Sequence, residues 1–372
     1  MIGSTGEMKW VAGPSPSPTT ILSCASSTMD FSKFRCPQCR QSRWTANLAA
    51  WTCDACGRAY PCVAAIPKLY LDEKLAAKDR NLRDTFYNGL FGVLYRHTMP
   101  FLNLPARPLK LSWAYWLAFF LTSSACAALL AYLGDLVFIR RFTVIRSVDV
   151  IILAATIAVG FFFVRHAYLF WLFLLAIPVK ISLVSKTFNP VQSFGTVHAR
   201  AIEKLKARGT VLRVLDVSTG SCNSLFRHGW MGLNAEFTGV DLSETMLTQG
   251  LRFMADHGLP IDLALASATD LPFQSGTFDV VMNYGAINSM SNPELALKEM
   301  ARVGKVGAFI LFLDEQLYGQ ASWIEKLYFR KVLSSHNVIH HCPVELLPTD
   351  LGDVDVHQVY QFYYICTARK MS

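Results

Sequence analysis

The sequence contains few charged residues for its length. Asp, Glu, Lys and Arg make up 17% of the 372 residues, and hydrophobic residues make up 52%, whereas charged residues average about 25% in globular proteins. No charged side chain occurs from Leu111 to Gly134, a length that exceeds the roughly 20 apolar residues needed to cross a bilayer. The N-terminus lacks a basic stretch followed by an apolar core, so we expect no secretory signal peptide.

Two shorter apolar runs, residues 150–164 and 167–179, follow the uncharged one. We therefore predict transmembrane or membrane-embedded helices in residues 111–185, arranged as a two-pass hairpin. Arginines at 140, 141 and 146 lie between the apolar runs, and the positive-inside rule favours a cytosolic location for such a loop. The alternative is therefore a re-entrant segment that returns to the same face of the membrane. Buried soluble helices are a weaker alternative, because these runs lack a polar face. The predicted domains are a disordered N-terminus (1–28), a zinc ribbon (29–70), a connector (71–110), the membrane segment (111–185) and a catalytic domain (186–372).

Four of the ten cysteines form two CxxC pairs separated by 13 residues. Two such pairs supply the four thiolates of a closed tetrahedral site, which predicts structural Zn²⁺ and a reducing compartment. A redox pair or a chance spacing is the alternative. The predicted ligands are Cys36, Cys39, Cys53 and Cys56.

Residues 53–61 and 66–69 carry the sequences CDACGRAYP and IPKL. They resemble the zinc ribbon of the Trm112-type family, whose members partner methyltransferases or are fused to them. The resemblance implies a protein partner bound through the ribbon. A similar ribbon in an RNA methyltransferase, together with 14 basic against 7 acidic residues in 1–110, keeps RNA recognition as an alternative.

Residues 211–241 predict a strand, a tight turn, a helix and a second strand. The apolar run VLRVLDV is followed by STGSCNS, and FTGVD then ends on Asp241. In a nucleotide-binding βαβ unit, backbone amides of such a turn approach the ligand, and the acid ending the second strand accepts hydrogen bonds from ribose hydroxyls. The segment therefore predicts a nucleotide-type cofactor site.

The blocks VLDVSTGSCN (214–223), GVDLS (239–243), ATDLPF (268–273), FDVV (278–281) and ALKEMARV (296–303) occur in order. Together they resemble class I S-adenosylmethionine (SAM) methyltransferases, most closely the branch of ubiquinone and menaquinone C-methyltransferases. The resemblance implies an α/β, Rossmann-like domain with a seven-stranded sheet, and SAM as cofactor. It assigns cofactor binding to Asp216, Ser218, Gly220, Cys222, Asp241, Leu242, Ser267, Ala268 and Asn283.

The chain departs from the family pattern at three of these positions. Ser218 and Cys222 replace glycines of the first motif, and Ser267 stands where relatives often have an Asp that contacts adenine. A side chain at Cys222 either crowds the cofactor or requires a slightly different turn. These replacements motivate an alternative function, a non-catalytic methyltransferase-like scaffold at the membrane.

The methyl acceptor is expected beyond the fourth strand of this domain, because open parallel sheets bind ligands at the carboxyl ends of their strands. Tyr284 and Asn288 are the substrate candidates, and a packed aromatic is an equal alternative for Tyr284. No catalytic residue is selected by spacing. The candidate bases are His198, His228, His340 and His341.

The sequence as a whole predicts a membrane-anchored SAM-dependent methyltransferase with both folded parts facing the cytoplasm. The apolar segment favours a small lipophilic substrate held near lipid. Residues 186–372 carry 16 basic and 18 acidic residues, which disfavours nucleic acid as the substrate. An RNA methyltransferase that uses the ribbon for recognition remains the main alternative.

Overall fold

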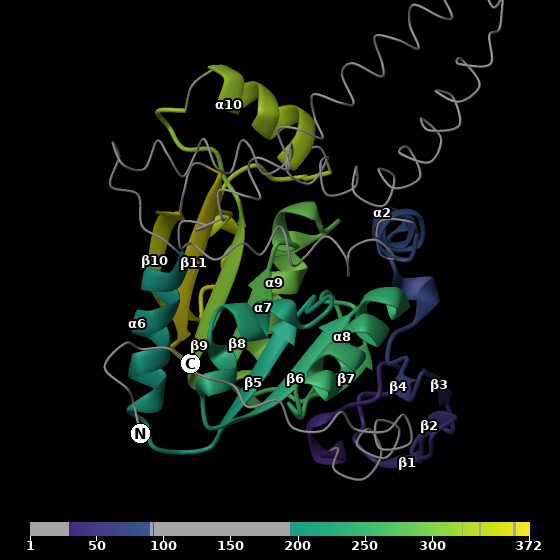
Figure 1. The fold of residues 1–372 in the computed structure, drawn as a ribbon. Coiled ribbons are helices and arrows are strands. Elements are labelled where there is room, and N and C mark those ends of the chain that lie inside the picture. Colours follow the sequence, from purple (N-terminus) through teal and green to yellow (C-terminus); the bar gives the residue numbers. More distant parts are fainter. Residues whose placement is uncertain (1–29, 90–91, 93–193, 322, 335, 360–361) are drawn as a thin grey trace, which may run out of the picture. The chain divides into compact units, whose positions relative to one another are not determined.

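A mixed seven-stranded sheet organises the second half of the chain in the computed structural model (Figure 1). The structure describes residues 30–89, 92, 194–321, 323–334, 336–359 and 362–372. The strand order is β10-β11-β9-β8-β5-β6-β7, and the neighbours from β9 to β7 are parallel. The strands are β5 (Leu212–Val217), β6 (Ala235–Asp241), β7 (Asp262–Leu265), β8 (Phe278–Tyr284), β9 (Gly304–Glu315), β10 (Leu351–Val359) and β11 (Tyr363–Lys370). This arrangement confirms the predicted Rossmann-like sheet.

The antiparallel hairpin of β10 and β11 closes the sheet beside β9. The hairpin extends from residue 351 to residue 370. The central parallel strands are apolar on both faces because helices cover both of them. In β5, for example, Arg213 is the one residue that is not fully buried.

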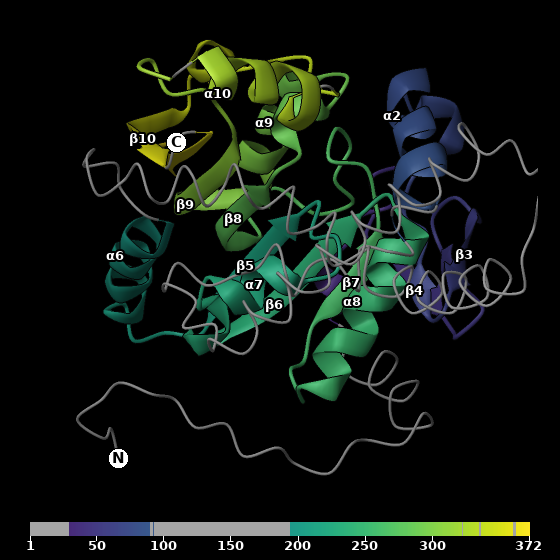
Figure 2. The ribbon, with the colours of Figure 1, turned by 45° about the horizontal axis from the view of Figure 1, so that its top comes forward.

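Helices cover the two faces of the sheet, as the two views in Figures 1 and 2 show. On one face α9 (Pro293–Val303) packs through its buried apolar residues, and it begins at Asn292, whose side chain accepts from the Leu295 amide at 2.9 Å. On the other face lie α6 (Phe194–Lys206), α7 (Asn223–Arg227) and α8 (Glu244–Asp256). Ser243 caps α8, and its side chain accepts from the Met246 amide. Short helical turns η5 (Trp230–Gly232), η6 (Ile287–Ser289) and η8 (Val344–Leu346) complete this part.

The N-terminal ribbon is a four-stranded antiparallel sheet with an aromatic core. It comprises η1 (Phe31–Lys33), β1 (Trp44–Ala46), β2 (Ala50–Cys53), β3 (Ala59–Val63) and β4 (Ile66–Pro67). The rings of Trp44 and Trp51 lie 5.6 Å apart, and Phe34 meets Trp51 edge-on at 5.1 Å. Aromatic side chains provide much apolar area per residue, which a module of this size requires.

The ribbon packs directly on the edge of the large sheet. Just after β4, the Leu69 amide donates to the Leu265 carbonyl of β7 at 2.7 Å. Lys33 is buried, and its ammonium group donates to Thr238 Oγ1 at 2.9 Å and forms an ion pair with Asp262. A buried lysine needs such partners because an unpaired charge in the interior is costly. The ribbon and the second half of the chain therefore share one core.

A connector runs from the ribbon past the carboxyl ends of the parallel strands, where the Asn88 side chain accepts from the Ser243 hydroxyl at 2.7 Å. Instead of one continuous helix, the chain forms η2 (Asp72–Lys74), α2 (Ala77–Asn81) and η3 (Leu82–Tyr87). Extended backbone at Leu75 separates the first two pieces, and its buried side chain belongs to the hydrophobic cluster that includes Leu247 and Met254 of α8. Burial of the Leu75 side chain is thus favoured over an uninterrupted helix.

Across the ranges that the structure describes, no helix combines the length and apolar character that crossing a bilayer requires. The predicted disordered N-terminus (1–28) and membrane segment (111–185) lie outside the described residues.

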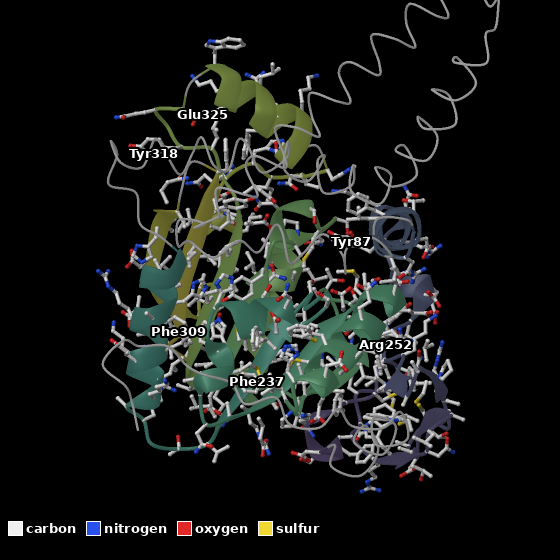
Figure 3. All side chains as sticks on the ribbon, viewed as in Figure 1. Tyr87, Phe237, Arg252, Phe309, Tyr318 and Glu325 are labelled. Atoms are coloured by element: carbon white, nitrogen blue, oxygen red, sulfur yellow. The ribbon has the colours of Figure 1, made fainter. Side chains whose placement is uncertain are left out.

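The segment after β9 contains α10 (Trp323–Tyr328) and η7 (Phe329–Leu333). Tyr318 and Glu325 of this segment lie at the end of the sheet toward which β5 and β6 point, and Tyr87 of the connector lies at the same end (Figure 3). Trp323 and Leu327 are exposed.

Candidate active site and metal centre

The turn after β5 adopts a left-handed backbone at every second residue. Ser218, Gly220 and Cys222 have φ angles of 59°, 55° and 60°. Glycine adopts this conformation freely, whereas an L side chain there costs roughly 1–2 kcal/mol. Ser218 and Cys222 therefore hold, at some cost in stability, a left-handed backbone that a glycine would adopt freely.

The thiol of Cys222 is accommodated by a glycine in the neighbouring helix. Cys222 is fully buried, and a Cβ built on Gly250 of α8 would lie 2.7 Å from its Sγ and 3.1 Å from the Ser221 carbonyl carbon. Gly250 lies outside the family motifs, although an isolated glycine in an amphipathic helix often marks such a close approach. The absence of a side chain at Gly250 thus leaves room for the Cys222 thiol.

We expect Gly250→Ala to destabilise the protein by about 1–3 kcal/mol, because the new methyl group overlaps the turn. Urea unfolding measures this loss, and calorimetry with S-adenosylhomocysteine measures its effect on cofactor binding. Gly319→Ala is the matched control, since a Cβ there meets no atom within 4 Å. Equal stability of the two variants would contradict the proposed role of Gly250.

Two acidic side chains lie beside the turn. Asp241 ends β6 and accepts from the amides of Gly220 at 2.9 Å and Ser243 at 2.8 Å. Asp216 on β5 is fully buried, and its Oδ2 accepts from the Thr219 hydroxyl at 2.7 Å. Burial raises the pKa of Asp216 to about 7, with a smaller contribution from the Asp241 charge. Burial likewise raises the pKa of Asp241, although backbone amides oppose it.

On the parallel strands of the large sheet, two buried acceptor atoms have no hydrogen-bond partner within the described part of the chain. They are Oδ1 of Asp216 and Oδ1 of Asn283, on the neighbouring strands β5 and β8. The amide nitrogen of Asn283 donates to the Val217 carbonyl at 2.8 Å, which fixes the orientation of this side chain. Buried polar atoms are rarely left unpaired, so both acceptors suit a ligand that brings donors, as the amino group of SAM would.

The turn after β7 lies next to Asp241. The Ala266 amide donates to the Asp241 carbonyl at 2.9 Å, and the Ser267 and Thr269 hydroxyls lie 2.8 Å apart. Ser267 and Ala268 are buried and Leu242 is half-buried. The residues predicted to bind the cofactor thus gather at the carboxyl ends of β5, β6, β7 and β8.

An aromatic and histidine cluster follows β8. The hydroxyl of Tyr284 accepts from Trp230 Nε1 at 2.6 Å and lies 2.8 Å from Nε2 of His198. The His228 ring stacks on both, with centroids 4.2 Å from His198 and 5.0 Å from Tyr284. Burial raises the pKa of Tyr284 well above its usual range. Two of the four candidate bases therefore meet at the predicted acceptor position, with Trp230 as a member that the sequence did not indicate.

The other substrate and base candidates lie apart from this cluster. Asn288 is fully buried; its amide donates to the Glu315 carbonyl at 2.7 Å and its oxygen accepts from Tyr364 at 3.0 Å. This network suits a structural role rather than contact with an acceptor. His340 and His341 are exposed, and His341 pairs with Glu345 at 3.0 Å.

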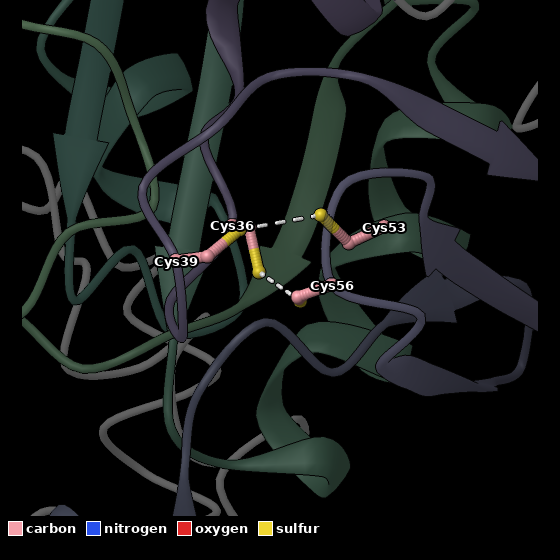
Figure 4. A group of neighbouring side chains, drawn as sticks. All are labelled: Cys36, Cys39, Cys53 and Cys56. Carbon is pink, nitrogen blue, oxygen red and sulfur yellow. Dashed lines mark hydrogen bonds between the residues drawn. The ribbon is translucent and has the colours of Figure 1, made fainter.

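The four predicted zinc ligands converge in the ribbon, with all sulfur atoms within 4.8 Å of one another (Figure 4). The Cys36 and Cys56 sulfurs lie 3.7 Å apart and those of Cys39 and Cys53 3.5 Å apart. Tetrahedral Zn²⁺ with bonds of about 2.3 Å places thiolate sulfurs about 3.8 Å from one another. The cluster therefore fits a closed, structural zinc ion.

Backbone and side-chain hydrogen bonds shape the two cysteine loops. The Arg40 amide donates to the Cys36 carbonyl at 2.9 Å, and the Gly57 amide donates to the Cys53 carbonyl at 2.8 Å. Burial opposes ionisation of Cys36, but hydrogen bonds from the Tyr60 hydroxyl and backbone amides bring its pKa down to about 7. Burial instead raises the pKa of the Cys53 thiol to about 12, so in the metal-free cluster Cys36 is the more acidic of these two thiols.

The sheet, the turn after β5 and the acid ending β6 define a methyltransferase-type Rossmann-like domain. Residues 215–312 match the family model described as a methyltransferase domain. Among curated proteins, the chain is similar to the ubiquinone/menaquinone biosynthesis C-methyltransferases UbiE of Laribacter hongkongensis (34% identity over 106 residues, 28% of this chain and 43% of the relative) and Nitrosospira multiformis (32% over 124 residues, 32% and 50%). The matches support the prediction of a SAM-dependent methyltransferase.

The chain spans about half the length of these curated relatives. Among solved structures, it is similar to a putative methyltransferase from Bacillus halodurans, with 16% identity, a TM-score of 0.37, and coverage of 46% of this chain and 99% of that chain. The strand order of the sheet and the match to the methyltransferase domain model indicate the fold.

Proposed function

We propose that this protein is a SAM-dependent methyltransferase that acts on a small lipophilic acceptor. The observation that carries the proposal is the pair of unpartnered buried acceptors, Asp216 Oδ1 and Asn283 Oδ1, beside the turn after β5. Asp216 and Asn283 would hold the amino-acid part of the cofactor, Asp241 the ribose, and Ser267 and Ala268 the adenine. SAM, when bound, supplies an electrophilic methyl group next to the carboxyl end of β8.

The Tyr284 cluster would remove the proton that the acceptor loses. The Trp230 indole can only donate, so it occupies one acceptor position of the Tyr284 oxygen, and with the His198 tautomer that leaves Nε2 unprotonated the tyrosine would donate its proton to that nitrogen. The Tyr284 hydroxyl can thus receive a proton from the acceptor while passing its own to Nε2 of His198. Such a relay suits a phenol or a ring carbon activated by phenolic hydroxyls.

The membrane part of the proposal rests on the sequence. The uncharged run 111–134 would hold the enzyme beside an acceptor that partitions into lipid, and the folded parts would face the cytoplasm. The names of the UbiE relatives point in the same direction, since a quinone precursor is a lipophilic aromatic compound.

The RNA alternative is disfavoured by how the ribbon uses its basic side chains. Lys33 and Arg40 pair with Asp262 and Asp270 of the methyltransferase domain, and Arg35 pairs with Glu299 at 3.3 Å. Charges neutralised inside the fold add little attraction for a phosphate backbone. The scaffold alternative predicts that the wild-type protein binds no cofactor, which titration calorimetry with S-adenosylhomocysteine tests.

The proposed activity is tested by transfer of a labelled methyl group from SAM to a hydroquinone carrying a short isoprenoid chain. We expect Tyr284→Phe to lower kcat by about 10²–10⁴, because general acid–base groups contribute that much. Calorimetry should show unchanged binding of S-adenosylhomocysteine. Tyr318→Phe, in the segment after β9, is the matched control and should keep wild-type activity. Full activity of Tyr284→Phe would remove this residue from the mechanism, and labelling of RNA alone would favour the alternative.

A further inference from the structure

The ribbon contacts the chain on both sides of the turn at residues 267–270. Before the turn, the Leu69 amide donates to the carbonyl of Leu265, the last residue of β7. After the turn, the Arg35 amide donates to the Pro272 carbonyl at 2.9 Å and the Gln274 amide donates to the Lys33 carbonyl at 3.0 Å. Both ends of the turn are therefore fixed by backbone bonds to the ribbon.

The one carboxylate of this turn is also bound by the ribbon and connector. Asp270 accepts from Arg40 at 2.5 Å and has Lys74 at 3.8 Å and Arg35 at 4.0 Å. Its side chain is 21% exposed, so these charges are only partly screened by water. Asp270 is therefore held on the ribbon side of the turn.

The position of Arg40 depends on the cysteine loop that precedes it. Arg40 follows Cys39 directly, has a left-handed φ of 65°, and donates its amide to the Cys36 carbonyl. An arginine adopts this backbone only where its surroundings enforce it. A metal ion that fixes Cys36 and Cys39 would thereby fix the guanidinium that holds Asp270.

We propose that the ribbon positions the adenine-binding turn of the methyltransferase domain, with Arg40 and Asp270 as positioning residues for cofactor binding. This inference rests on the proposed function, since it assigns a second task to the same cofactor site. The ribbon then acts on a small-molecule pocket of its own chain, and zinc loading and cofactor affinity are coupled through the ion pair of these two residues.

The test compares full-length Arg40→Gln with Arg43→Gln, a neighbouring basic residue that forms no ion pair across the described interface. Calorimetry with S-adenosylhomocysteine should show binding weakened about three- to fivefold in Arg40→Gln, which is the range expected for a partly exposed ion pair. Arg43→Gln should bind as the wild type does. Zinc content should be the same in all three proteins, which separates positioning from loss of the metal.

Asp270→Asn should weaken binding at least as much, because it also removes the charge that faces Lys74 and Arg35. The double variant should bind no more weakly than Asp270→Asn, because the Arg40–Asp270 pair is already lost in that single variant. Wild-type affinity in both single variants, or fully additive losses, would overturn the proposal. Hydrogen exchange of the Ala268 and Thr269 amides gives a readout that needs no cofactor. If the wild type binds no S-adenosylhomocysteine, the proposed function fails, and the positioning role stands or falls on whether these amides exchange faster in Arg40→Gln than in Arg43→Gln.

Discussion

Asp241→Ala is expected to weaken binding of S-adenosylhomocysteine about a hundredfold or more. Hydrogen bonds to a charged group are worth about 1.5–3 kcal/mol each, and the carboxylate would accept from two ribose hydroxyls. The same substitution removes the acceptor of the Gly220 and Ser243 amides, so the turn after β5 also loses its support. Titration calorimetry on the full-length protein measures the change in affinity.

Asp256→Ala, at the exposed C-terminal end of the same βα unit, is the matched control and should bind as the wild type does. The full chain is required, because removing the ribbon would leave Asp262 without Lys33 and would expose β7. Unchanged affinity of Asp241→Ala would show that the ligand does not occupy this site. Absence of binding in the wild-type protein would favour the scaffold alternative.

The double substitution Cys36→Ser/Cys53→Ser is expected to lower the melting temperature by about 10 °C or more. Structural zinc contributes about 10–16 kcal/mol to the folding of small zinc-finger peptides, and a loss of several kcal/mol shifts the melting temperature of a protein of this size by that amount. The ribbon core includes both cysteines and continues into the sheet core, so the loss should reach the methyltransferase domain. Thermal unfolding and metal analysis on the same samples measure both effects.

Cys62→Ser is the control for this experiment. Its thiol lies outside the four-sulfur cluster, 3.9 Å from the Asn47 carbonyl, and is half-buried. The variant should keep its metal and its melting temperature within a few degrees. Stoichiometric zinc in the double serine variant, with unchanged stability, would contradict a structural four-cysteine site.

The parts of the fold that depend on local sequence could be predicted. The strand order of the methyltransferase domain follows from motifs in a fixed order, and the caps of α8 and α9 lie at Ser243 and Asn292, where short polar side chains can accept from the first turn. The convergence of the four cysteines follows from the spacing of two CxxC pairs. The break at Leu75 could not be predicted, because its side chain is buried in a cluster with residues of α8, far along the chain.

The residues of the candidate site also divide into those that local sequence predicts and those that depend on distant parts of the chain. The acids and small residues of the first two motifs could be placed because their spacing determines their position on β5 and β6. The cluster of Tyr284 with His198 could not, since the two residues are 86 positions apart and no motif links them. The docking of the ribbon depends on pairs such as Lys33 with Asp262, 229 positions apart, in which each residue alone would be read as a solvent-exposed charge.

The pairing of the ribbon with β7 also bears on self-association. A β-strand at the border of a sheet presents unpaired amides and carbonyls to any other strand of the same protein. Here the segment after β4 occupies that position, while at the opposite border β10 carries a bulge and the exposed acids Asp353 and Asp355. Detachment of the ribbon would uncover a short apolar strand, so a metal-depleted preparation should aggregate before its catalytic domain unfolds.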